Sequence, residues 1–234
     1  MGAIAFTLVS GPATAGTIPI PNGCTAYLTV QQRQCLVTHH YICEGDPAGH
    51  QWRVDVTDAG MTYAAKIDAE TQWVYSLDLF GGREETLVDN PADPASFSSL
   101  LDAEIDTYDF QTQTQDGVTT RFYGFDRING TTAIDEVDLL TSDFEITSED
   151  ADGAVLWSAT GNQYVSPEFR MFFFGTDTTT IADGAVSNTD HTPVNFIFPG
   201  EQGFLSDTPD YDCNTTMSRW DAQPDAADLM EVSQ

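Results

Sequence analysis

The sequence predicts an all-β protein, a mainly antiparallel meander with one short helix. Short β-prone segments recur along the chain, and turn-forming pairs such as Asp116-Gly117 and Asp152-Gly153 separate them. No repeat of roughly 20 to 50 residues is present, which argues against propellers and solenoids. We expect an open half-barrel or barrel-like sheet, with a β-sandwich as the alternative.

The expected elements follow in order from local composition. Residues 34–43 are β-prone and lack Gly and Pro, so they predict a strand in which His39 and His40 point to opposite faces. Asp93 is expected to cap a helix over 94–101, with Pro94 in its first turn. Asn129-Gly130 predicts a hairpin turn, and the polar residues 176–193 predict a long loop. Further strands are expected at 51–57, 61–67, 71–79, 107–115, 118–126, 143–148 and 154–159.

The four cysteines predict two disulfides. Cys35 and Cys43 would lie roughly 26 Å apart along one extended strand, too far to bond to each other or to share a metal ion. A hairpin turning near residues 33–34 would place Cys24 opposite Cys43, which leaves Cys35 for Cys213. Disulfides on this pattern are typical of exported proteins.

The chain is strongly acidic. It carries 37 acidic and 8 basic residues, a formal net charge of -29, with Lys66 as its single lysine. Such a field repels nucleic acid and anionic membrane surfaces, so neither is expected as a partner. Because the acids are spread along the whole chain, we interpret them as a solvated surface suited to a salty medium, with a cationic partner or calcium as alternatives.

The amino-terminal residues predict export. A short apolar run, AIAFTLV over residues 3–9, precedes the small-residue pattern Ala13-Thr14-Ala15, so residues 1–15 are expected to be a signal peptide. Residues 16–220 are expected to form a single β domain and 221–234 a frayed acidic tail. We find no further apolar stretch of membrane length and expect a soluble monomer in the periplasm or outside the cell.

Two metal sites were considered and are not expected. His39 or His40 could meet His50 across the turn that follows Cys43, but a disulfide-bonded strand explains this segment better. Residues 210–221 place oxygen ligands in the register of a calcium loop, yet Thr215 stands where that loop needs Gly and Asp221 replaces the longer Glu. No cofactor is expected either.

Aromatic residues give the best indication of a binding site. Phe172, Phe173 and Phe174 make one predicted strand apolar on both faces, and both faces must then be covered. One interpretation is that the helix over 94–101 and the segment around Phe196 cover them. The other is a concave sheet with an apolar pocket, for which the candidate ligand-binding residues are Trp157, Phe172, Phe173, Phe174 and Phe196.

A resemblance to an uncharacterised family of exported bacterial proteins is carried by the segments CTAYLTVQQRQC, HHYICEGDPAGHQWRVD, IDAETQW, GNQYVSPEFRMFFFG and FIFPGEQGFL. That resemblance implies no activity. In architecture the chain also looks like the unclosed β-barrels that carry lipids or lipoproteins across the periplasm.

Nothing in the motifs indicates nucleophilic catalysis, because a Gly-x-Ser-x-Gly elbow is absent and both disulfides together use all four cysteines. We therefore expect a non-enzymatic binding or carrier module for an apolar small molecule or an envelope protein. The alternative is a carboxylate-dependent envelope hydrolase.

Overall fold

A computed structural model describes residues 16–213 as a single rolled antiparallel sheet with one short helix. The predicted signal peptide, the predicted tail and most of the segment considered for calcium lie outside the described residues. The elements are β1 (Cys24–Gln32), β2 (Leu36–Cys43), β3 (Gln51–Thr57), β4 (Gly60–Ile67), β5 (Trp73–Asp78), β6 (Glu84–Leu87), α1 (Phe97–Ala103), β7 (Ile105–Thr114), β8 (Thr119–Ile134), β9 (Val137–Glu149), β10 (Val155–Ser166), β11 (Met171–Ile181), β12 (Val186–Asp190) and β13 (Pro193–Ile197).

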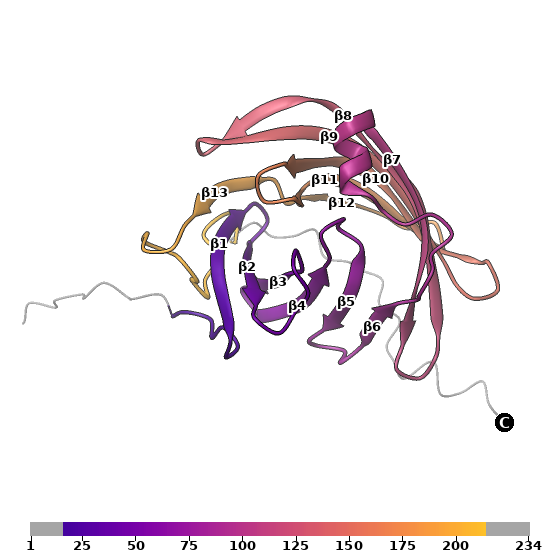
Figure 1. Cartoon of the computed structure of the whole chain (residues 1–234), viewed down its shortest axis with the longest axis horizontal. Helices are drawn as coiled ribbons and strands as arrows, with labels where there is room; N and C mark the ends of the chain where they lie inside the picture. The colour runs from indigo at the N-terminus through magenta and orange to yellow at the C-terminus, as the bar shows by residue number, and fades with distance from the viewer. Residues whose placement is uncertain (1–15, 214–234) are drawn as a thin grey trace, which may run out of the picture.

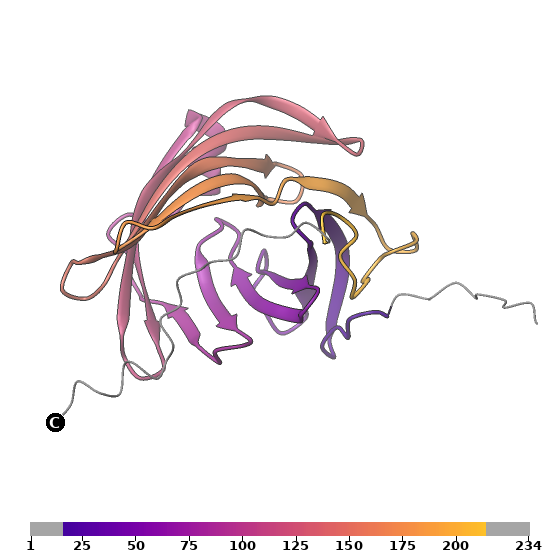
Figure 2. The same ribbon diagram turned by 180° about the vertical axis from the view of Figure 1, so that it is seen from behind.

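The sheet is a meander that curls back on itself without closing. Each strand from β1 to β12 pairs with its neighbours in the chain, and β13 then pairs with β1 at the opposite end. The long strands β7–β11 arch over the shorter strands β1–β6, as both views show (Figures 1 and 2). No ladder joins the two edge strands, β12 and β13, so the prediction of an open, barrel-like sheet is confirmed.

The main apolar core fills one end of the roll. There β13 contacts β8 and β11 across the interior, in addition to its pairing with β1. Burial of these side chains holds the two edges of the sheet near each other, since each buried side chain contributes about 1.5 to 3 kcal/mol. The buried members are Leu28, Val30, Val137, Leu139, Met171, Phe173 and Phe196.

Two glycines allow neighbouring long strands to approach each other closely. A Cβ at Gly124 would lie 1.9 Å from the carbonyl oxygen of Glu145, and a Cβ at Gly161 would lie 2.1 Å from that of Thr176. Any side chain at either position would collide with the adjacent backbone. Glycines inside strands are a known means of curving a sheet.

The first hairpin is stapled as its sequence predicts. Disulfides join Cys24 to Cys43 and Cys35 to Cys213. The expected strand over 34–43 begins later, at Leu36, because Gln34 and Cys35 have positive φ and form the turn. Two disulfides indicate an oxidising environment.

Terminal segments cover the outer face of β1–β4. Ile18 donates its backbone N–H to the carbonyl of Leu205, which joins the first described residues to the last turn region. Both residues pack with an outer cluster built from Val37, Val54 and Val56. The opposite face of these strands points into the interior of the roll.

The helix begins later than predicted. Ser96, not Asp93, caps α1: its side chain accepts a hydrogen bond from the backbone N–H of Ser99. Asp93 instead exchanges two backbone hydrogen bonds with Asp109. Because Asp93 is held in this bridge to β7, the helix begins only after Ser96.

Two further predictions about turns and loops were wrong. Asn129-Gly130 lies inside β8, where Gly130 marks a bulge and Asn129 accepts a hydrogen bond from Thr141. The hairpin turns at Asp135 and Glu136, both with positive φ.

The expected loop over 176–193 forms the second half of β11, all of β12 and the start of β13. Its threonines are β-branched and favour strands, which outweighs its polarity. In the described part of the chain, no helix is long and apolar enough to cross a membrane.

Candidate functional site

A cavity of about 400 Å³ lies inside the roll, between β3–β5 on one side and β7–β11 on the other. Pockets of this size accommodate small organic ligands. Aromatic side chains form most of its apolar wall: Tyr63, Trp73, Tyr75, Tyr108, Phe110, Phe144, Trp157, Phe172, Phe173 and Phe174.

Ring contacts connect part of the aromatic wall. Trp73 packs edge-on against Phe110 and Phe122, with ring centroids 5.3 Å apart in both pairs. Phe122 in turn lies 6.1 Å from Trp157. Trp73 is nevertheless 43% exposed. A tryptophan that lines a cavity and remains this exposed offers apolar surface to a ligand.

Four of the five residues singled out in the sequence line this cavity: Trp157, Phe172, Phe173 and Phe174. Phe196 does not. It is buried in the main core, edge-on to Phe173 at a centroid distance of 5.0 Å.

The other interpretation, in which the helix and the segment around Phe196 cover the aromatic strand, also holds in part. Phe97 of α1 packs edge-on against Phe172 at 5.7 Å, and Phe196 covers Phe173. Both covering contacts and a cavity are therefore present.

Arg53 supplies a positive charge at the cavity wall. Its Nε lies 2.8 Å from a carboxylate oxygen of Asp55, which is 7% exposed. The guanidinium carbon lies 4.5 Å from the Phe174 ring centre and 5.6 Å from that of Tyr63. Burial raises the pKa of Asp55, and the Arg53 charge opposes that rise.

Asp126 supplies a buried carboxyl on the same wall. It is 9% exposed, and among the described residues no group donates a hydrogen bond to its side chain. Burial, reinforced by the charge of Asp106 directly opposite on β7, raises the pKa of Asp126 to about 7. Asp126 is therefore divided between its neutral and charged forms near neutral pH.

The other charged residues of the wall are paired. Lys66 binds Asp46 at 3.2 Å. Asp177 accepts hydrogen bonds from the hydroxyls of Thr179 and Thr189. Asp126 and Asp177 stand in one cross-strand row, with Phe144 and Gly161 between them. Three strand spacings, about 14 Å along the sheet, separate the two acids.

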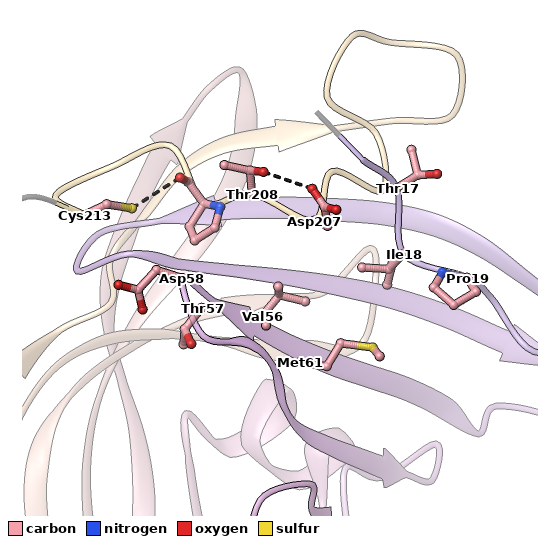
Figure 3. A pocket seen from close by; sticks show the side chains of 12 residues that line it. Thr17, Ile18, Pro19, Val56, Thr57, Asp58, Met61, Asp207, Thr208 and Cys213 are labelled. Carbon is pink, nitrogen blue, oxygen red and sulfur yellow. Dashed lines mark hydrogen bonds between the residues drawn. The ribbon is translucent and has the colours of Figure 1, made fainter. Parts of the chain in front are cut away.

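A second hollow, of about 550 Å³, lies on the outer face of the sheet (Figure 3). Ile18, Val56 and Met61 form its apolar part, with Asp58 and Asp207 at its rim. It is larger than the inner cavity but lacks aromatic side chains. Its wall ends at Cys213, the last described residue. We therefore take the inner cavity as the candidate site.

The histidines of the first hairpin are core residues. His39 bonds the hydroxyl of Thr29, and His40 packs edge-on against Phe173 at 5.8 Å. Burial lowers the pKa of His39 to about 4 and that of His40 to about 3, so both are neutral at pH 7. Across residues 16–213, no cluster of three or more His, Cys, Asp or Glu side chains is arranged to hold a metal ion.

Sequence reasoning missed several members of the wall. Arg53, Trp73, Phe110, Phe144 and Asp126 come from five different strands. One signal was available, because Tyr108 and Phe110 alternate with polar residues on β7 and so mark its inner face.

Comparisons with known proteins add no assignment: no family model, no curated protein and no solved structure matches this chain.

Proposed function

We propose that this protein is an exported, non-enzymatic binding or carrier module that takes the apolar part of a ligand into the inner cavity, in the periplasm or outside the cell. The observation that carries the proposal is the aromatic cavity of about 400 Å³ inside the roll. Full burial of one such side chain contributes roughly 1.5 to 3 kcal/mol, so a protein gains stability by filling such a space with its own residues. A cavity that leaves Trp73 exposed supports a binding role.

The open roll supports a carrier role in a second way. Because no ladder joins β12 to β13, the two halves of the sheet are linked at that edge by side-chain packing, by the chain itself and by single hydrogen bonds such as that from the Phe196 N–H to Asp135. Side-chain contacts separate more readily than a continuous ladder of backbone hydrogen bonds. A ligand held between the halves therefore has a route in and out.

Native mass spectrometry of protein purified from an exporting host tests this proposal. We expect a bound apolar molecule that is released on unfolding. Ala65→Phe should abolish the bound mass, because Ala65 lines the cavity and a phenyl ring would occupy it.

Ala64→Phe is the matched control. Ala64 is the adjacent residue of β4, on the opposite face, and is not part of the cavity wall. That variant should keep its bound molecule. Bare protein masses for the wild type, together with no uptake of an added long-chain alcohol, would refute the binding role.

A second candidate function, carboxylate-dependent hydrolysis in the cell envelope, is favoured by Asp126 alone. A carboxyl with a pKa near 7 is suited to general acid catalysis, and Asp106 stands opposite it. Asp106, however, is not part of the cavity wall, and its carboxylate accepts the backbone N–H of Ser96. Turnover of chromogenic esters or glycosides by the wild type, lost in Asp126→Asn, would establish this function. No turnover by the wild type would exclude these substrate classes.

A further inference from the structure

Within the described residues, the inner cavity carries one charged side chain without a partner, and that side chain indicates which ligands the cavity takes. Arg53, Lys66 and Asp177 each have a charged or hydroxyl partner in the described protein. Asp126 has none there, although it lines the cavity and is 9% exposed. The Asp126 oxygens open onto the cavity, and a largely buried carboxylate that receives no hydrogen bond from the protein is costly.

We infer that Asp126 binds the protonated amine of an amphipathic ligand whose hydrocarbon part fills the aromatic cavity. This inference rests on the proposed binding function and specifies its ligand class. An ammonium group would supply the donors that the carboxylate lacks.

The surroundings of Asp126 fit a cation. Phe144 lies directly opposite it on β9, and Tyr108 lies diagonally across β7. Aromatic faces attract cations, most strongly where water is excluded. The net charge of -29 also raises the local concentration of cations and lowers that of anions.

Arg53 does not support the opposite choice, an anionic ligand. Its charge is balanced by Asp55 at 2.8 Å, and the Phe174 ring covers one face of the guanidinium at 4.5 Å. An anion there would have to compete with a buried carboxylate that is already in place.

Three probes with the same ten-carbon alkyl chain test the inference: decylamine, decanoate and 1-decanol, each below its micellar concentration or solubility limit. Binding is measured by calorimetry at pH 8 and 0.15 M salt, with intrinsic tryptophan fluorescence as a second readout. We expect the wild type to bind decylamine at least about tenfold more tightly than decanoate, as one buried charge-assisted contact allows. Equal affinities would overturn the inference.

Two variants test whether Asp126 causes the preference for the amine. Asp126→Asn should abolish the preference for the amine while leaving 1-decanol affinity within about threefold, since an amide has the shape of the carboxyl without its charge. Asp143→Asn, on the neighbouring strand, removes the same charge from an exposed position and should retain the preference. A preference that persists in Asp126→Asn would assign it to the general acidic field instead.

A pH series adds an independent readout. Alkylamines remain protonated up to about pH 10, whereas Asp126 gains its proton as the pH falls through about 7. Decylamine affinity should therefore fall from pH 8 to pH 6 in the wild type and remain level in Asp126→Asn.

The other groups near Asp126 are Asp106 and Tyr108 on β7, with Phe144 on β9; Asp93 and Glu70 act on Asp106. A parallel fall in both proteins would assign the effect to those other acids and refute the role of Asp126. Failure of all three probes to bind would refute the proposed function itself, whereas 1-decanol binding without an amine preference would refute the inference alone.

Discussion

The guanidinium carbon of Arg53 lies 4.5 Å from the centre of the Phe174 ring, although the seven strands from β4 to β10 separate β3 from β11 in the sheet. This contact crosses the interior of the roll. It joins the two halves at the cavity, while the Nε of Arg53 neutralises Asp55. Arg53 thus contacts the opposite side of the roll and also neutralises a buried acid beside the cavity.

Replacing Arg53 should destabilise the fold in a pH-dependent way. Arg53→Met leaves the buried Asp55 without its counter-ion, which typically costs about 3 to 5 kcal/mol. Burial already raises the pKa of Asp55, and loss of Arg53 raises it further. A raised carboxyl pKa lowers stability progressively as the pH rises from the ordinary pKa to the raised one, so the loss measured by urea unfolding should be larger at pH 8 than at pH 5. Arg127→Met, at an exposed position, should change stability little at either pH. Equal losses for Arg53→Met at both pH values would contradict this account.

Asp126→Asn should stabilise the ligand-free protein at pH 8. The folded-state pKa of Asp126 is about 7, above its ordinary value of 3.8, so the folded protein becomes less stable as this group ionises between those values. Three pKa units correspond to at most about 4 kcal/mol, which the neutral amide would recover. At pH 3, below both values, the wild-type carboxyl is protonated in the folded and the unfolded protein, so the two proteins should unfold at similar urea concentrations. A variant less stable than the wild type at pH 8 would show that the carboxylate is satisfied in the fold.

The two disulfides should contribute unequally. Cys35–Cys213 closes a loop of 178 residues and Cys24–Cys43 one of 19. In the chain-entropy model these loops are worth about 5 and about 3 kcal/mol respectively. Replacing both cysteines of a pair by serine, and comparing the two double variants by urea unfolding, checks the order. A larger loss from the short loop would mean that native packing, not loop entropy, dominates.

Gly124 and Gly130 lie on the same strand and should respond differently to alanine. At Gly124 the new Cβ would lie 1.9 Å from the Glu145 carbonyl oxygen, a contact that requires the strands to separate. Its nearest neighbour at Gly130 would be the Thr141 hydroxyl at 3.0 Å, which can rotate. We expect Gly124→Ala to cost more than about 2 kcal/mol and Gly130→Ala less than about 1. Similar melting temperatures for the two variants would rule out close strand approach as the reason for Gly124.

Local sequence signals predicted turns correctly where a single hairpin is enough to set the structure. The turns at Asp116-Gly117 and Asp152-Gly153 form as expected, with positive φ at both glycines. The turn predicted at Asn129-Gly130 does not form, because β8 continues through these residues to the turn at Asp135. Pairing of this long strand with β9 outweighed the local preference of Asn-Gly for a turn.

The candidate site was only partly predictable. Trp157 and the run Phe172 to Phe174 stand out in sequence because aromatic residues cluster there. Arg53 and Asp126 look like any other charged strand residue, and with 37 acids an individual Asp carries no signal. Their importance arises from burial, which depends on what lies across the roll.

The sequence by itself determined many of the strands, the alternation of faces along them, and the pairing of Cys24 with Cys43, because strand periodicity and hairpin pairing are local. Only the tertiary structure decided that β3 faces β11 and that Phe196 belongs to the core while Trp73 lines a cavity. It also decided that Asp126 is largely buried and receives no hydrogen bond from residues 16–213. The physical reason is that curvature accumulates over many strands. Small bends at positions such as Gly124 and Gly161 add up to a roll, and no single segment records where its two halves will meet.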